Sequence, residues 1–260
     1  MKIISLLKAT TFLFLISTVS VQAQINSADE AQQKIDKITQ KIKINPNNAK
    51  LYSSRGDLYF LLHDFDSAVE DYSHAIKLDD NLDTAWFGRG MARGRQGFIK
   101  EGIADLSVYL KRHPNDSRAH TKRGVRYLWL GEKENARHDL QTAIKLKPDN
   151  AEAHDDLGVI LAQTGDFKNA IHHFQTTVRI DPSYQKGHHN LAMALYITGN
   201  DALALISVNN SLKLKPQARN SLLLKSKILT AMGKQKEAQQ IQEDAMFLPE
   251  DNWHESAPVY

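Results

Sequence analysis

Glycine recurs along this chain at a fixed interval of 34 residues. One series comprises Gly97, Gly131, Gly165, Gly199 and Gly233, and a second comprises Gly56, Gly90, Gly124 and Gly158. A constant period of this length is typical of stacked repeats, in which each unit buries its apolar face only against its neighbours. The sequence therefore predicts an array that grows by adding units, and a fold of this kind presents extended surfaces for recognition.

Each 34-residue unit contains two helical patterns. With Gly56 at position 8, the repeats begin at Ala49, Asp83, Ser117, Ala151, Gln185 and Arg219. Positions 4, 7, 8 and 11 share one face of a first helix because side chains at i, i+3, i+4 and i+7 lie together. Small residues at position 20 let a second, antiparallel helix approach closely. The glycine at position 15 is expected to end the first helix in a left-handed conformation, and proline at position 32 to stop the second.

This pattern resembles the tetratricopeptide repeat. The signature of that family has an aromatic residue at position 4, Leu-Gly at positions 7 and 8, Tyr at 11, Ala at 20, Phe at 24, Ala at 27 and Pro at 32, and the match here runs through six units without an insertion. The resemblance implies an all-α fold, a right-handed superhelix (α-solenoid) of six tetratricopeptide helix-turn-helix repeats with an N-terminal cap helix. The predicted boundaries are 1–23, a signal peptide; 24–48, a linker and cap helix; 49–252, the repeats (49–82, 83–116, 117–150, 151–184, 185–218 and 219–252); and 253–260, a flexible tail.

The N-terminus has the pattern of an export signal. Lys2 and Lys8 precede an apolar run from Ala9 to Val19, and Val21-Gln22-Ala23 places small residues at a cleavage site after Ala23. The alternative is an uncleaved anchor, but the run is shorter than the roughly 20 residues that a spanning helix needs. We therefore expect a periplasmic or secreted protein with no stable membrane span after cleavage.

Composition narrows the range of partners. The chain has 33 basic and 30 acidic residues, and loss of Lys2 and Lys8 leaves 31 against 30, so the mature protein is nearly neutral. Nucleic acid is not an expected partner of such a chain. The absence of cysteine excludes disulfides, thiolate nucleophiles and cysteine-based metal sites.

A basic band in the second and third repeats marks the predicted binding region. The net charges of the first four repeats, counted over 34 residues each, are −4, +2, +4 and −3. In the resembling family the first helices line a concave groove, so the resemblance implies that their outward positions contact a partner. We predict that an acidic or C-terminal peptide of a protein partner is bound by Phe87, Met91, Arg95, Arg118, Lys122, Val125 and Trp129. By contrast, Arg55, Arg89 and Arg123 at position 7 are expected inside the repeat, bonded to backbone or acidic neighbours.

Histidines and paired acids raise a metal-binding or enzymatic alternative. His120, His154 and His188 share position 4, which favours packing residues with a satisfied polar tip. Adjacent histidines such as His172 and His173 point about 100° apart on a helix and do not form an i, i+4 ligand pair. Asp155 and Asp156 are expected to be solvated. We therefore predict no catalytic residue, no metal site and no cofactor.

The sequence as a whole favours a non-catalytic scaffold or adaptor of the cell envelope that binds a partner peptide or helix in its concave groove. Two alternatives remain open. One is a pilus or envelope-complex assembly factor, and the other, of a different class, is a histidine-based metal-binding protein or enzyme. The sequence does not identify the partner or the oligomeric state.

Overall fold

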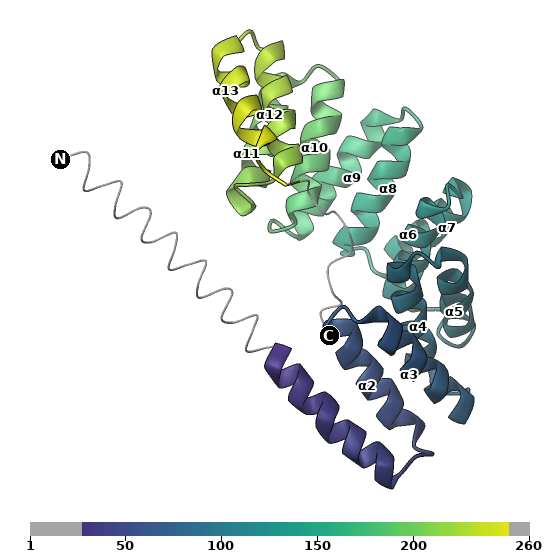
Figure 1. Ribbon diagram of the computed structural model, residues 1–260. Coiled ribbons are helices and arrows are strands. Elements are labelled where there is room, and N and C mark those ends of the chain that lie inside the picture. The colour runs from purple at the N-terminus through teal and green to yellow at the C-terminus, as the bar shows by residue number, and fades with distance from the viewer. Residues whose placement is uncertain (1–27, 250–260) are drawn as a thin grey trace, which may run out of the picture. The chain divides into compact units, whose positions relative to one another are not determined.

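A computed structural model describes residues 28–249 of the chain as a succession of antiparallel helix pairs (Figure 1). Residues 28–44 are helical, and no strand occurs between residues 28 and 249. The helices that follow are α2 (Ala49–Leu61), α3 (Phe65–Leu78), α4 (Asp83–Gln96), α5 (Ile99–Arg112), α6 (Ser117–Trp129), α7 (Lys133–Leu146), α8 (Ala151–Gln163), α9 (Phe167–Ile180), α10 (Gln185–Ile197), α11 (Asp201–Leu214), α12 (Arg219–Ala231) and α13 (Gln235–Met246). The all-α repeat architecture predicted from the 34-residue period is confirmed. The predicted signal peptide and the predicted tail over 253–260 lie outside the described residues.

Position 15 reverses the chain between the two helices of a repeat. Gly97 follows α4 with φ of 90°, and the other four glycines of its series have φ between 75° and 84°. The first repeat has His63 at this position, also left-handed, with φ of 61°. A β-carbon is disfavoured in this region of backbone space, which explains why glycine recurs here.

The second glycine series brings the two helices of a repeat together. A β-carbon built on Gly56 would lie 3.0 Å from the ring of Tyr72, and one on Gly158 would lie 2.6 Å from Phe174. Both aromatic residues occupy position 24 and are buried. The second glycine series therefore reflects close packing of a small residue on a large one, and not a phosphate-binding loop.

The described chain divides into two compact units, one ending at Arg112 and the other beginning at His113. In the first unit, the buried residues of α2, α3 and α4 form one core, and Ile42 from the helical segment 28–44 joins it. In the second unit, Ala136, Leu140 and Leu157 belong to a core between α6, α7 and α8, while Phe174 and Val208 belong to another that extends to α12. Each core lies between helices adjacent in sequence, as a repeat array requires.

Candidate functional site: the inner face of the repeats

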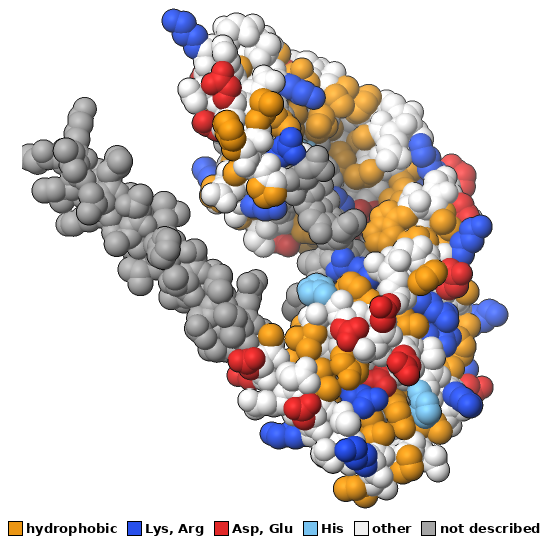
Figure 2. Space-filling view, viewed as in Figure 1, with side chains coloured by type: hydrophobic (Ala, Val, Ile, Leu, Met, Phe, Trp, Pro, Cys, Tyr) orange, Lys and Arg blue, Asp and Glu red, His pale blue; other side chains and the backbone are white. Residues whose placement is uncertain are grey.

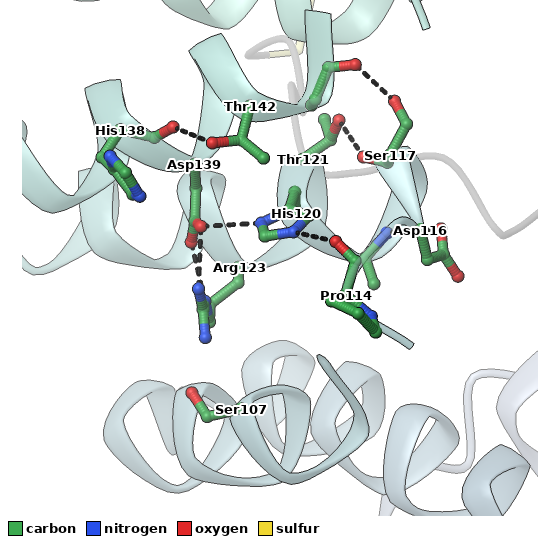
Figure 3. Close-up of polar contacts among 12 residues, drawn as sticks. Ser107, Pro114, Asp116, Ser117, His120, Thr121, Arg123, His138, Asp139 and Thr142 are labelled. Carbon is green, nitrogen blue, oxygen red and sulfur yellow. Dashed lines mark hydrogen bonds and ion pairs between the residues drawn. The ribbon is translucent and has the colours of Figure 1, made fainter. Parts of the chain in front are cut away.

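Arginines at position 7 form internal ion pairs in the first three repeats. Arg55 donates two hydrogen bonds to Asp71, of 2.7 and 2.8 Å, and Arg89 donates two to Asp105, of 2.9 and 2.8 Å. Arg123 binds Asp139 in the same bidentate way, at 2.7 and 2.8 Å (Figure 3). The prediction that these arginines bond acidic neighbours inside the repeat is confirmed. Bidentate pairs of this kind fix geometry as well as charge, and we assign them to the scaffold.

In the first five repeats, the side chain at position 4 forms a hydrogen bond with the turn that precedes the repeat. Tyr52 Oη donates to the carbonyl of Pro46, and Nε2 of His120 and His154 lies 3.0 and 3.1 Å from the carbonyls of Pro114 and Pro148. Because a carbonyl only accepts, the ring nitrogen must donate. The expected packing role with a satisfied polar tip is confirmed for these histidines.

The second ring nitrogen distinguishes His120 from His154. In Figure 3, His120 lies between Pro114 and Asp139, with Nδ1 2.9 Å from the Asp139 carboxylate. This hydrogen bond outweighs burial and raises the pKa of His120. Burial pushes the pKa of Asp139 upward, but the hydrogen bonds from Arg123 and His120 outweigh it and lower that pKa. Both ring nitrogens of His120 face oxygen acceptors, so this buried cluster favours the protonated form of the ring.

His154 faces another histidine instead of a carboxylate. Its Nδ1 lies 2.9 Å from Nδ1 of His173, and because Nε2 of His154 donates to Pro148, His173 must donate in this bond. Burial lowers the pKa of His154, and burial together with His154 and His172 lowers that of His173 to about 4. Among residues 28–249, no group of three or more histidine and carboxylate side chains is arranged to hold a metal ion.

Three predicted binding residues lie on α4, in the first unit. Phe87, Met91 and Arg95 are spaced by four residues and share one face of the helix. Phe87 packs edge-on against Tyr109, with ring centroids 5.2 Å apart, and Met91 is only 2% exposed. The Arg95 guanidinium lies 5.9 Å from the ring centroid of Phe65, and its buried Nε has no hydrogen-bond partner.

The other four lie on α6, in the second unit. Arg118 is exposed, Trp129 is 43% exposed, and Val125 is buried. Lys122 is 8% exposed and donates to both carboxylate oxygens of Glu152 on α8, at 2.7 and 2.9 Å. On this helix, Arg118 and Trp129 are the predicted residues with the most accessible side chains.

First helices lie side by side in the second unit. α6 contacts α8, α8 contacts α10 and α10 contacts α12, whereas within the described part of this unit successive second helices make no such contacts. The unit therefore curves with its first helices on the inner side. The side chains of α6, α8, α10 and α12 that point away from the second helices form one surface. We call this surface the inner face.

Ion pairs between neighbouring first helices line the inner face. Position 6 of one repeat pairs with position 2 of the next, so Lys122 binds Glu152, and Asp156 accepts a hydrogen bond of 3.2 Å from Lys186. Lys186 also lies 3.1 Å from Asp155, which accepts a further bond of 2.9 Å from Asn190. In the sequence, the paired charges lie 30 residues apart. We did not predict these ion pairs from that spacing.

The expectation that Asp155 and Asp156 are solvated was wrong. They are 0% and 5% exposed, and burial raises the pKa of both carboxyls. Burial works to lower the pKa of Lys186, but Asp156 and Asp155 outweigh it and raise that pKa. Two buried carboxylates share one ammonium group, so the second negative charge is incompletely compensated. A desolvated charge network therefore lies between α8 and α10.

Charge elsewhere on the surface is mixed. Figure 2 shows Lys and Arg side chains interspersed with Asp, Glu and apolar side chains over the visible face. No helix within residues 28–249 is both long enough and apolar enough to cross a membrane.

Models of the tetratricopeptide repeat family match residues 49–82 and 121–185. Human tetratricopeptide repeat protein 13 is 30% identical over 95 residues, which cover 36% of this chain and 11% of that protein. The Pisum sativum translocon at the outer membrane of chloroplasts 64 is 39% identical over 88 residues, covering 34% and 15%. The chain thus spans less than a sixth of the length of either of these relatives.

Solved structures share the architecture at low sequence identity. The tetratricopeptide protein YrrB, described as having an unusual peptide-binding site, aligns with a TM-score of 0.55 and 22% identity, over 71% of this chain and 95% of its own. The pilF protein of Pseudomonas aeruginosa aligns with a TM-score of 0.69 and 17% identity, over 77% and 92%. At these identities the likeness shows the fold alone, and the alternative of a pilus assembly factor stays a prediction.

Proposed function

Because this chain is a tetratricopeptide repeat protein, and such a fold serves as a scaffold for protein-protein interaction, we propose that it is a non-catalytic adaptor of the cell envelope that binds an acidic peptide or helix of a partner protein. The proposed binding surface is centred on α6. The observation that carries the proposal is that α6 has exposed Arg118 at its start and half-exposed Trp129 at its end, and no acidic residue. Of its other basic residues, Arg123 is paired with Asp139 inside the repeat and Arg126 is fully buried.

Charge and apolar surface have separate roles in this proposal. Arg118 offers a guanidinium that can form paired hydrogen bonds with a carboxylate and so orient the peptide. Trp129 offers a large amphipathic ring, the kind of side chain that supplies affinity at the centre of an interface. Lys122 contributes positive potential while it holds Glu152, so its role is partly structural.

Predicted residues Phe87, Met91 and Arg95 provide a second candidate surface on α4. Met91 is part of the core of the first unit, and Phe87 is packed on Tyr109. We therefore assign partner contact on this helix chiefly to Arg95, whose side chain is partly exposed.

Site-specific photocrosslinking in producing cells tests the α6 surface. A photoreactive amino acid at Trp129 should yield a discrete adduct with one partner, whereas the same group at His138, exposed on the second helix α7, should not. Arg118→Ser should reduce the adduct at position 129 at least fivefold without changing helix content. Equal adducts at the two positions, or no effect of Arg118→Ser, would count against the proposal.

Location in the envelope rests on the N-terminal sequence pattern. Mass spectrometry of the native protein should find Gln24 as its first residue, and fractionation should recover the chain with periplasmic or secreted proteins. An intact N-terminus in the cytosolic fraction would contradict this part of the proposal.

A further inference from the structure

The segment from Glu250 to Tyr260 has a composition opposite to that of the inner face. It contains Glu250, Asp251 and Glu255, no lysine or arginine, and the aromatic residues Trp253 and Tyr260. It follows α13, which ends at Met246. Its acidic character is the chemistry that we propose for the partner peptide.

The inner face ends at α6 and α12, and every charged residue of these two helices is basic. On α6 the charged residues are Arg118, Lys122, Arg123 and Arg126, and on α12 they are Arg219, Lys225 and Lys227. The carboxylates of α8 are engaged between them, since Glu152 binds Lys122 and both aspartates bind Lys186. The exposed cations at the two ends of the inner face are Arg118 on α6 and Lys227 on α12, and such an arrangement favours an acidic chain that runs between them.

The segment is long enough to make this connection. Eleven residues in extended form reach about 36 Å. The segment follows α13, which is packed against α12. Adjacent packed helices lie about 8 to 10 Å apart, so the four steps from α13 through α12, α10 and α8 to α6 cover about 32 to 40 Å, which matches this reach.

We propose that residues 250–260 bind to the inner face of the second unit and compete there with the partner. This inference rests on the proposed function, because it assigns the same surface to an internal ligand. A tethered segment acts at an effective concentration of the order of millimolar. Even a weak internal contact, with a dissociation constant of about 0.1 mM, would then reduce the apparent affinity for an outside ligand about tenfold.

The test uses the full chain and a fluorescent peptide of residues 250–260. In one variant, Glu250→Gln, Asp251→Asn and Glu255→Gln remove the negative charges of the segment, and Trp253→Ser removes its indole ring. We call this chain the neutralised variant. Fluorescence anisotropy should show that this variant binds the wild-type peptide, whereas the unmodified chain binds it at least tenfold more weakly. Equal affinities for the two chains, or no binding by the neutralised variant at about 1 mM peptide, would overturn the inference.

Two substitutions in the neutralised background locate the site. Lys227→Ser on α12 removes an exposed inner-face cation and should weaken peptide binding at least threefold. Lys168→Ser removes an exposed cation from the second helix α9 and should leave it unchanged. Equal effects of the two substitutions would overturn the assigned surface.

Partner crosslinking separates this inference from the proposed function. If the adduct at Trp129 forms equally with the unmodified and neutralised chains, the segment does not compete and the inference fails, while the partner surface stands. If the peptide binds as expected but no adduct forms in cells, the internal contact holds and the proposed partner surface fails.

Discussion

The pair formed by His154 and His173 should make the fourth repeat sensitive to acid. The pKa of His173 falls from an ordinary value of 6.5 to about 4, chiefly because burial disfavours the cation. Between these values the unfolded chain binds a proton that the folded chain does not, so the stability contribution is fully present above pH 6.5 and is lost as pH falls toward 4. The full difference corresponds to about 3 kcal/mol. Because His173 is only partly buried, solvent screening reduces our expectation to about 1 to 2 kcal/mol.

His173→Asn is the informative variant. Its amide can still donate to Nδ1 of His154, but it takes up no proton, so the variant should lose about 1 to 2 kcal/mol less than the wild type between pH 7.5 and 4.5. Urea unfolding at the two pH values measures the difference, and hydrogen exchange of α8 and α9 locates it. His172→Asn, an exposed neighbour, is the matched control. A titration of the His173 ring near pH 6.5 by NMR, or equal losses in both variants, would refute the reasoning.

In the third repeat, His120 should contribute to stability with the opposite dependence on pH. The hydrogen bond to Asp139 raises the pKa of His120, so its contribution is fully present below pH 6.5 and is lost as pH rises through the folded value. His120→Asn should therefore cost more stability at pH 6 than at pH 9. A cost independent of pH would show that His120 is neutral in the fold.

Asp105→Asn should destabilise the first unit by about 3 kcal/mol, because buried Asp105 binds both Arg89 and Arg93 and its loss leaves two partly buried cations without this carboxylate. Urea unfolding should show less than about 0.5 kcal/mol for the exposed control Glu101→Gln. Gly88→Ala should cost about 1 to 3 kcal/mol, since the new β-carbon would lie 2.4 Å from the Tyr72 ring, and an unchanged melting temperature would contradict this packing. Ile206→His should leave stability within about 0.5 kcal/mol, because Ile206 is 57% exposed on α11 and the equivalent position of another repeat carries histidine; a larger loss in thermal unfolding would mean that its side chain is packed.

Repetition made local roles predictable. Position 7 arginine recurs with an aspartate 16 residues later, and position 4 recurs with a carbonyl six residues earlier, so each contact is set by one hairpin or one turn. Register alone is sufficient for such contacts, because helix geometry and a short connection fix the distance. The internal arginines and the satisfied histidines were predicted for this reason.

The sequence pattern did not predict the contacts between neighbouring repeats. Glu152 is 30 residues from Lys122, and Lys186 is 30 from Asp156. Whether such side chains meet depends on how each repeat is rotated against the next and on the rotamers that packing allows. That rotation also decides burial, so Asp155 and Asp156 are enclosed although their sequence context suggested a solvated face.

By itself, the sequence determined the helix pairs, their period and the residues that join them, because these depend on backbone conformation and on contacts within one repeat. Only the tertiary structure decided which charges of the inner face neutralise one another and which stay accessible. The physical reason is that the energy of a charge depends on its distance from other charges and from water, and the stacking of successive repeats sets both distances.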